Sequence, residues 1–197
     1  MSKKELYINI DIETDGPAAG VNSMLSLGAA VFDRAGAQIA LWYRTLEPLA
    51  GGIRNGDTMA WWGTQPAAWE EANKDQESPF YAIPEFALWC EGISEGHKLV
   101  ACAWPAAFDF SFVNYYLWRF AGRNPLGFAC LDMRSYANGM YRVPGYYEKI
   151  PEGDLYKIFD IKTDDLRPHV AVDDAIRQGR LLMAMLKSAD QGWNVDR

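Results

Sequence analysis

The stretch KELYINIDIET, residues 4–14, alternates between two kinds of side chain and sets the expected centre of the fold. Its isoleucines, Ile8, Ile10 and Ile12, point to one side of an extended chain, which is the period-two pattern of a β-strand with a buried face. The other side carries Tyr7, Asn9, Asp11 and Glu13. A face made only of isoleucine indicates a central strand, in which another element would cover the acidic side chains.

Two more strands are expected directly after this one, MLSLGAAVF at 24–32 and AQIALWYRTLE at 37–47, with a tight turn at 33–36 between them. Strands joined in this way form an antiparallel meander. Two short apolar stretches further along, KLVACAW at 98–104 and GFACLD at 127–132, are expected to add two strands. The sequence therefore predicts a mixed, five-stranded sheet.

Apolar residues at helical spacing lie between and after these strands. The expected helices are 58–62, 66–74, 83–96, 106–122, 133–142 and 170–187. Asp57 is the expected N-cap of the first helix, and Gly122 is the expected glycine after the fourth. Residues 143–168 are rich in Pro, Gly and charge and are expected to form a long loop, which is usually functional or mobile. This order of elements predicts an α/β fold with helices on both faces of the sheet.

The length of 197 residues fits one domain, 1–197, with a sizeable core. No stretch approaches the ~20 apolar residues of a membrane span, and the first ten residues do not match a secretory signal. Cys90, Cys102 and Cys130 are odd in number and have apolar neighbours, so we expect buried free thiols and a cytoplasmic location.

The net charge of −7 argues against a broad basic surface for nucleic acid. It does not exclude an enzyme of nucleic acids, because bound divalent cations can supply positive charge where a phosphate lies. The sequence thus leaves a nuclease open and makes a large electrostatic binding surface improbable.

Four carboxylates and a histidine are candidate site residues. Asp11 and Glu13 are two apart on one strand and lie on the same face. Asp109 is near the start of one helix, and His169 and Asp174 lie at the start of another. Each also has an ordinary explanation: an exposed strand face for the first pair, the favourable end of a helix dipole for Asp109 and Asp174, and an exposed helix start for the histidine.

The combination is harder to explain structurally, because these residues can converge at one end of the sheet. Four carboxylates repel one another unless cations bind, and Mg²⁺ or Mn²⁺ prefers such oxygen ligands. Two ions roughly 3.5–4 Å apart assist the in-line attack of water on phosphate. A histidine, with an ordinary pKa of about 6.5, can accept the proton of that water at neutral pH.

DIET at 11–14, FD at 108–109 and HVAVDDA at 169–175 resemble, in order and spacing, the three motifs of the DEDDh 3′-5′ exonuclease superfamily, the ribonuclease-T-like and proofreading-subunit-like enzymes. The ending H-x-A-x-x-D is the most specific part, and the resemblance covers nearly the whole chain. It implies a ribonuclease-H-like fold, a five-stranded mixed β-sheet flanked by α-helices. By the same resemblance, the ligands of two divalent ions, Mg²⁺ or Mn²⁺, would be Asp11, Glu13, Asp109 and Asp174, and the general base would be His169.

Three positions near these motifs need comment. Asp173 does not match the family's ligand position, so we expect it to cap the helix or to support the ligands. The family often has Asn where this chain has Pro105, which puts substrate contacts there in doubt but not the metal site. Ser26 stands where many relatives carry Glu, and that residue is not a metal ligand.

The segment TMAWWGTQPAAWEEA, residues 58–72, resembles a segment with paired tryptophans in phage exodeoxyribonucleases of the DexA type and their bacterial relatives. Successive helical residues diverge by about 100°, so one tryptophan can lie in the core while the other reaches the cleft, where a base could stack on it. The expected substrate-binding residues are Thr14, Trp61, Trp62 and Phe108.

The sequence predicts a metal-dependent 3′-5′ exonuclease that releases nucleoside monophosphates from single-stranded 3′ ends, with DNA slightly favoured over RNA. An exoribonuclease is the alternative within the family. A non-catalytic nucleic-acid-binding module and a small-nucleotide phosphoesterase are alternatives from other classes, and the first is disfavoured because all five motif positions are filled. Many members of this superfamily are dimers, so the resemblance also allows a homodimer. No stretch of the sequence defines an interface.

Overall fold

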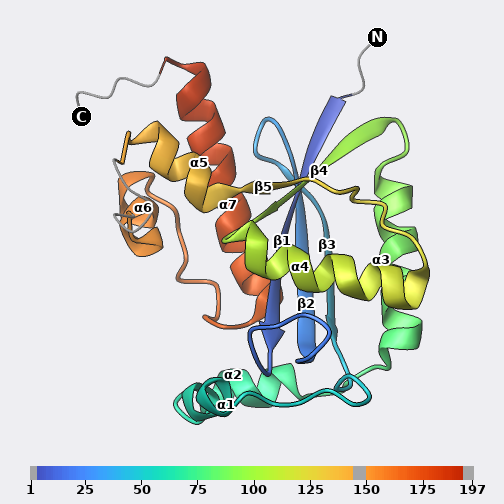
Figure 1. Cartoon of the computed structure of the whole chain (residues 1–197). Coiled ribbons are helices and arrows are strands. Elements are labelled where there is room, and N and C mark those ends of the chain that lie inside the picture. The colour runs from blue at the N-terminus through green and yellow to red at the C-terminus, as the bar shows by residue number, and fades with distance from the viewer. Residues whose placement is uncertain (1–3, 144–149, 193–197) are drawn as a thin grey trace.

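The computed structural model describes residues 4–143 and 150–192 and contains a five-stranded sheet with the order β3-β2-β1-β4-β5 (Figure 1). The strands are β1 (Lys4–Thr14), β2 (Met24–Asp33), β3 (Gln38–Thr45), β4 (His97–Ala103) and β5 (Cys130–Asp132). β1 pairs antiparallel with β2 and parallel with β4. β1 is therefore the central strand, as predicted, and the mixed sheet and the opening meander are confirmed.

Helices cover both faces of this sheet. They are α1 (Gly56–Trp62), α2 (Pro66–Ala72), α3 (Pro79–Ile93), α4 (Ala106–Tyr116), the π-helix η1 (Leu117–Ala121), α5 (Met133–Met140), α6 (Glu152–Ile158) and α7 (Ala171–Asp190). In Figure 1, α3 and α4 lie on one side of the sheet, α5, α6 and α7 lie on the other, and α1 and α2 lie below the end at which β1 finishes.

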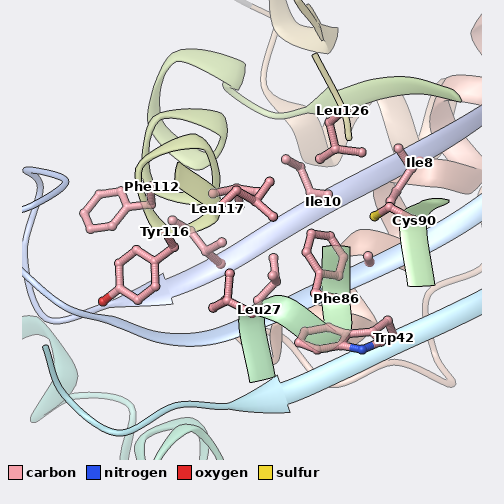
Figure 2. Packing of buried hydrophobic residues seen from close by; sticks show 14 of the residues in the cluster. Ile8, Ile10, Leu27, Trp42, Phe86, Cys90, Phe112, Tyr116, Leu117 and Leu126 are labelled. Carbon is pink, nitrogen blue, oxygen red and sulfur yellow. The ribbon is translucent and has the colours of Figure 1, made fainter. Parts of the chain in front are cut away.

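The isoleucine side of β1 forms the larger core, between the sheet and helices α3 and α4. Figure 2 shows Ile8 and Ile10 facing Phe86 of α3, with Leu117 and Tyr116 alongside. All five of these side chains are almost completely buried. Burying an apolar side chain of this size stabilises a fold by roughly 1.5–3 kcal/mol, which explains why this face of β1 is apolar from Leu6 to Ile12.

The polar side of β1 lies under α7, and two glycines allow this helix to lie very close to the sheet. A Cβ atom on Gly28 of β2 would lie 2.2 Å from the backbone carbon of Ala171, at the start of α7. A Cβ atom on Gly179 of α7 would lie 2.2 Å from the ring of Phe32 on β2. Gly28 therefore lets the first turn of α7 lie beside the end of β1, and Gly179, about two turns further along, lets the middle of α7 lie against Phe32 of β2.

Several element boundaries differ from the predicted ones. α3 begins at Pro79 rather than at residue 83, because Pro79 takes the first helical position, and Pro84 lies inside the helix. The side chain of Asn55, not Asp57, caps α1 by accepting a hydrogen bond from the Thr58 amide at 3.0 Å. Asp57 lies inside the first turn, where its charge favours the helix dipole.

The later part of the chain also holds differences. The predicted helix 106–122 is α4 followed by the π-helix, and it ends at Gly122 with a left-handed φ of 67°, as expected for that glycine. β5 has three residues and not six. The segment 143–168 contains α6 and is not a continuous loop, and residues 144–149 of it lie outside the described residues.

Within residues 4–143 and 150–192, no helix is long and apolar enough to cross a membrane. The three cysteines are free thiols; Cys90 and Cys102 are buried, as predicted, whereas Cys130 is half-buried.

Candidate active site

The structure brings all five predicted metal and catalytic residues to one pocket of about 380 Å³. The pocket lies where β1 ends and where α4 and α7 begin. The residues of the acidic constellation that line it are Asp11, Glu13, Asp109, His169 and Asp174. Segments that are far apart in the sequence meet here because β1 is central and because both helices start at the same end of the sheet.

Asp11 and Glu13 are buried on the side of β1 that faces α7. Oδ1 of Asp11 accepts a hydrogen bond of 2.9 Å from the side-chain amide of Gln178 on α7. This bond joins the strand to the helix and holds the carboxylate of Asp11 in a fixed orientation. A buried carboxylate with a single amide partner keeps free lone pairs for another ligand.

Asp109 enters the pocket from the first turn of α4 and is only 3% exposed. Asp132, at the end of β5, positions the start of this helix, because its Oδ2 accepts a 2.7 Å hydrogen bond from the Ala106 amide. Its Oδ1 accepts another from the Ser135 amide of α5, so that one carboxylate caps two helices. Oδ2 of Asp109 has no hydrogen-bond partner among the described residues.

The three buried carboxylates are electrostatically strained without a counter-charge. Burial, followed by the charges of Asp109 and Glu13, raises the pKa of Asp11 well above its usual range. Burial and then the charge of Asp109 raise the pKa of Glu13 to about 8. Burial is also the main cause of the strongly raised pKa of Asp109. Each group would ionise at its usual pH if positive charge lay nearby.

His169 and Asp174 form the side of the pocket at the start of α7. The backbone N–H of His169 donates to Oδ2 of Asp174 at 2.9 Å, and His169 has a left-handed φ of 58°. Donor atoms of Glu13, His169 and Asp174 lie within 4.8 Å of one another. Partial burial, followed by the charge of Arg177, lowers the pKa of His169 below 6.5. Its imidazole is thus neutral at pH 7 and can accept a proton.

A divalent cation fits the chemistry of this donor set. The free oxygen of Asp109, the mutual repulsion of Asp11, Glu13 and Asp109, and the oxygen-only ligands together match what Mg²⁺ and Mn²⁺ bind. Asp174 adds a fourth carboxylate, which is ion-paired with Arg177. A bound cation would offset both the burial and the repulsion that raise these pKa values.

The paired tryptophans take different positions. Trp62 is 2% exposed, and its Nε1–H donates to the carbonyl oxygen of Thr14 at 2.9 Å, which anchors α1 to the end of β1. Trp61 is 39% exposed, and its ring lies edge-to-face on the ring of His169 with centroids 4.9 Å apart. Of the two, only Trp61 has a ring face that a nucleotide could contact.

Of the other residues expected near the substrate, one lines the pocket and the others support its surroundings. Phe108 lines the pocket beside Asp109. Thr14 is buried and contacts α1 through its carbonyl oxygen. Asp173 accepts hydrogen bonds from the backbone and side-chain nitrogens of Arg167, so it supports the segment that leads to His169.

Seven residues of the pocket were not among those predicted, and four of them have polar or charged side chains that bear on the chemistry of the acidic residues: Glu152, Tyr156, Arg177 and Gln178. Arg177 and Gln178 follow Asp174 by three and four positions on one helix, so helical spacing alone places them on the same face and could have identified them. Glu152 and Tyr156 come from α6, in the segment expected to be a loop, and no sequence signal connects that segment to the acidic residues.

The model of the 3′-5′ exoribonuclease Rv2179c-like domain matches residues 6–186 of this chain. The chain is also 28% identical over 189 residues to the 3′-5′ DNA exonuclease Cap18 of Escherichia coli, covering 95% of both proteins.

Solved structures with the same arrangement of strands and helices include the nuclease domain of 3′hExo, described as a DEDDh family member bound to rAMP. It matches with a TM-score of 0.69 and 13% identity over 98% of this chain and 95% of that one. E. coli exonuclease I in complex with a dA16 oligonucleotide matches with a TM-score of 0.64 and 16% identity, over 95% of this chain and 42% of that one. The predicted ribonuclease-H-like fold is therefore confirmed.

Proposed function

Because the chain belongs to the 3′-5′ exoribonuclease Rv2179c-like domain family, we propose that it removes nucleotides from single-stranded 3′ ends with the help of two divalent cations, Mg²⁺ or Mn²⁺. The protein is a 3′-5′ exonuclease of nucleic acid and hence a phosphodiester hydrolase.

One observation carries the assignment of residues: three buried carboxylates, of which Asp109 has a free oxygen, meet a fourth carboxylate and a neutral histidine in one pocket. A purely structural cluster of this kind would lower the stability of the fold, because buried like charges repel one another. The cation ligands we propose are Asp11, Glu13, Asp109 and Asp174. When bound, divalent cations activate the attacking water and stabilise charge on the departing 3′ oxygen.

The protein groups then have distinct tasks. His169, neutral at pH 7, accepts the proton of the water that attacks the phosphorus of the terminal phosphodiester. The bond to the 3′ oxygen of the preceding nucleotide breaks, that oxygen takes up a proton, and a nucleoside 5′-monophosphate leaves. Gln178 keeps Asp11 oriented, and the hydrogen bond from the His169 amide to Asp174 keeps the base next to its carboxylate neighbour.

Substrate contact is proposed for two aromatic side chains. Trp61 offers a half-exposed ring beside His169, and a base stacked on such a ring gains about 1–3 kcal/mol whatever its identity. Phe108 offers a second apolar surface beside Asp109. These contacts suit an enzyme that accepts single strands of any sequence.

We propose DNA as the preferred substrate, and RNA is the second candidate. The E. coli relative is a DNA exonuclease and aligns over nearly its whole length, which favours DNA. The family description favours RNA. Recognition of RNA would require a contact to the 2′-hydroxyl, and none of the described pocket residues can be assigned to that task.

The test is a time course on 5′-labelled single-stranded DNA and RNA of one sequence, with Mg²⁺ or Mn²⁺ and with EDTA as control. Asp109→Asn is run in parallel, because it keeps the shape of the side chain but removes its charge. We expect a ladder that shortens from the 3′ end, faster for DNA, and that disappears with EDTA and in the variant. Full activity of Asp109→Asn, or cleavage in EDTA, would refute the proposed site, and faster cleavage of RNA would reverse the proposed preference.

A further inference from the structure

α6 contributes a carboxylate to the pocket that belongs to none of the three sequence motifs. Glu152, at the first position of α6, lines the same pocket as Asp11 and Asp109. Its charge adds to the effect of burial, which is the main cause of the raised pKa of both Asp11 and Asp109. The helix itself is held by the buried side chain of Leu155, which belongs to the hydrophobic cluster between the sheet, α5 and α7.

The surroundings of Glu152 keep its carboxylate directed at this site. The hydroxyl of Tyr156, one turn further along α6, donates a hydrogen bond to Oε1 of Glu152. The guanidinium of Arg177 lies over the ring of Tyr156 at 5.8 Å. Burial raises the pKa of Glu152, and the hydrogen bond from Tyr156 and then the charge of Arg177 oppose this rise. A half-buried carboxylate beside two buried carboxylates is unfavourable unless something in the pocket uses the added negative charge.

We propose that Glu152 is a fifth carboxylate of the cation site, supplied by α6 and held in place by Tyr156, and that it strengthens cation binding on the side of Asp11 and Asp109. This rests on the proposed function, since it requires the divalent cations proposed above. Asp109, whose Oδ2 has no hydrogen-bond partner among the described residues, lines the same pocket and is one of the proposed ligands beside which this added charge would act. Removal of a residue that supports metal ligands typically weakens metal binding roughly 10–100-fold.

The proposal predicts effects of opposite sign on cation affinity and on stability. In Glu152→Gln the side-chain oxygen can still accept the hydrogen bond from Tyr156, but the charge is gone. We expect Mn²⁺ affinity to fall roughly 10-fold or more. We also expect the Tm of the metal-free variant to rise by about 2–4 °C, because one source of repulsion among the buried carboxylates has been removed.

The experiment measures Mn²⁺ affinity by titration calorimetry and the metal-free Tm, both on the full chain at one pH. Asp154→Asn is the matched control: it removes a carboxylate from the same helix, but Asp154 is exposed and its partner is Lys157. This variant should bind Mn²⁺ as the wild type does. Tyr156→Phe leaves the ring against Arg177 but removes the hydroxyl, and it should weaken Mn²⁺ binding in the same direction but less.

Asp109→Asn separates failure of this inference from failure of the proposed function. If Asp109→Asn loses Mn²⁺ binding while Glu152→Gln keeps it within twofold of the wild type, Glu152 is not part of the cation site. A lowered metal-free Tm of Glu152→Gln with unchanged affinity would make Glu152 a structural residue and would also overturn the inference. If Asp109→Asn itself binds Mn²⁺ normally, the proposed cation site fails as a whole.

Discussion

His169 combines two properties that a proton acceptor needs at neutral pH. Its imidazole has a lowered pKa, because it is partly buried and close to Arg177. Its backbone is fixed in the left-handed region by the hydrogen bond to Asp174, and a non-glycine residue remains there only where its surroundings hold it. The ring is also held from outside by Trp61.

His169→Ala should lower kcat by roughly 10²–10⁴-fold, because the attacking water loses its proton acceptor. The binding of a single strand should change little, since the ring is proposed to act on the water. His97, the other histidine, is far from the site at the start of β4, so His97→Ala is the matched control. Steady-state kinetics on labelled single strands give the answer. A kcat of His169→Ala within a few-fold of that of the control would reject the role of general base.

Trp61→Ala should weaken the binding of a single-stranded DNA by roughly 5–150-fold, the equivalent of about 1–3 kcal/mol of stacking. Trp61→Phe, which keeps an aromatic face, should recover most of this loss. Fluorescence anisotropy in the presence of Ca²⁺ measures the Kd, and an unchanged value for Trp61→Ala would exclude a stacked base.

Trp62→Phe removes the hydrogen bond to Thr14 and should lower the Tm, because the Trp62 ring belongs to the core.

At the scale of helices and strands, the position of α7 relative to β2 decides whether the site exists. The contact at Gly28 places the first turn of the helix directly on the strand, and the contact at Gly179 keeps the helix close to Phe32 about two turns later. Asp174 and Gln178 can reach the residues of β1 only from this distance. A side chain at either glycine would push α7 away from the sheet and separate the ligands.

Gly28→Ala should destabilise the protein by about 3 kcal/mol, because the new methyl group would meet backbone atoms of Ala171 and Val172 that cannot move aside. Gly92→Ala is the control, since this glycine is exposed near the end of α3 and a Cβ atom there meets nothing within 4 Å. It should be neutral or stabilising by up to about 1 kcal/mol. Urea unfolding measures both, and a stability of Gly28→Ala equal to that of the wild type would contradict the close contact of α7 with β2.

Elements with strong periodicity could be predicted from the sequence, and those that depend on tertiary contacts could not. The isoleucines of β1 predicted a central strand, and the motifs predicted the five residues that meet in the pocket. α6 could not be predicted, because it is short and is held by the burial of Leu155 in the cluster between the sheet, α5 and α7 rather than by its own pattern. Glu152 was therefore missed, and so was the double cap by Asp132, which joins segments that the sequence does not connect.

At the scale of the whole molecule, the buried carboxylates make the stability of the fold depend on pH and on cations together. The pKa of Glu13 is raised to about 8, and those of Asp11 and Asp109 are raised well above their usual range of about 4. Between about pH 4.5 and 8, the metal-free folded protein therefore binds more protons than the unfolded chain does. Its stability must fall as the pH rises through this window, because the folded state gives up protons that it holds more tightly.

Bound divalent cations should oppose this fall in stability with rising pH. They bind the ionised carboxylates, so their affinity rises with pH, and a ligand that binds only the folded state raises its stability. We expect the Tm in EDTA to decrease from pH 5.5 to 8 and the increase in Tm caused by Mn²⁺ to become larger over the same range. Asp109→Asn should flatten both trends, because one charge of the cluster is gone. Thermal scans at several pH values, with and without Mn²⁺, provide the test. A Tm in EDTA that rises toward pH 8 would mean that the carboxylates ionise freely in the folded protein. An increase in Tm with Mn²⁺ that does not vary with pH would mean that no cation compensates their repulsion.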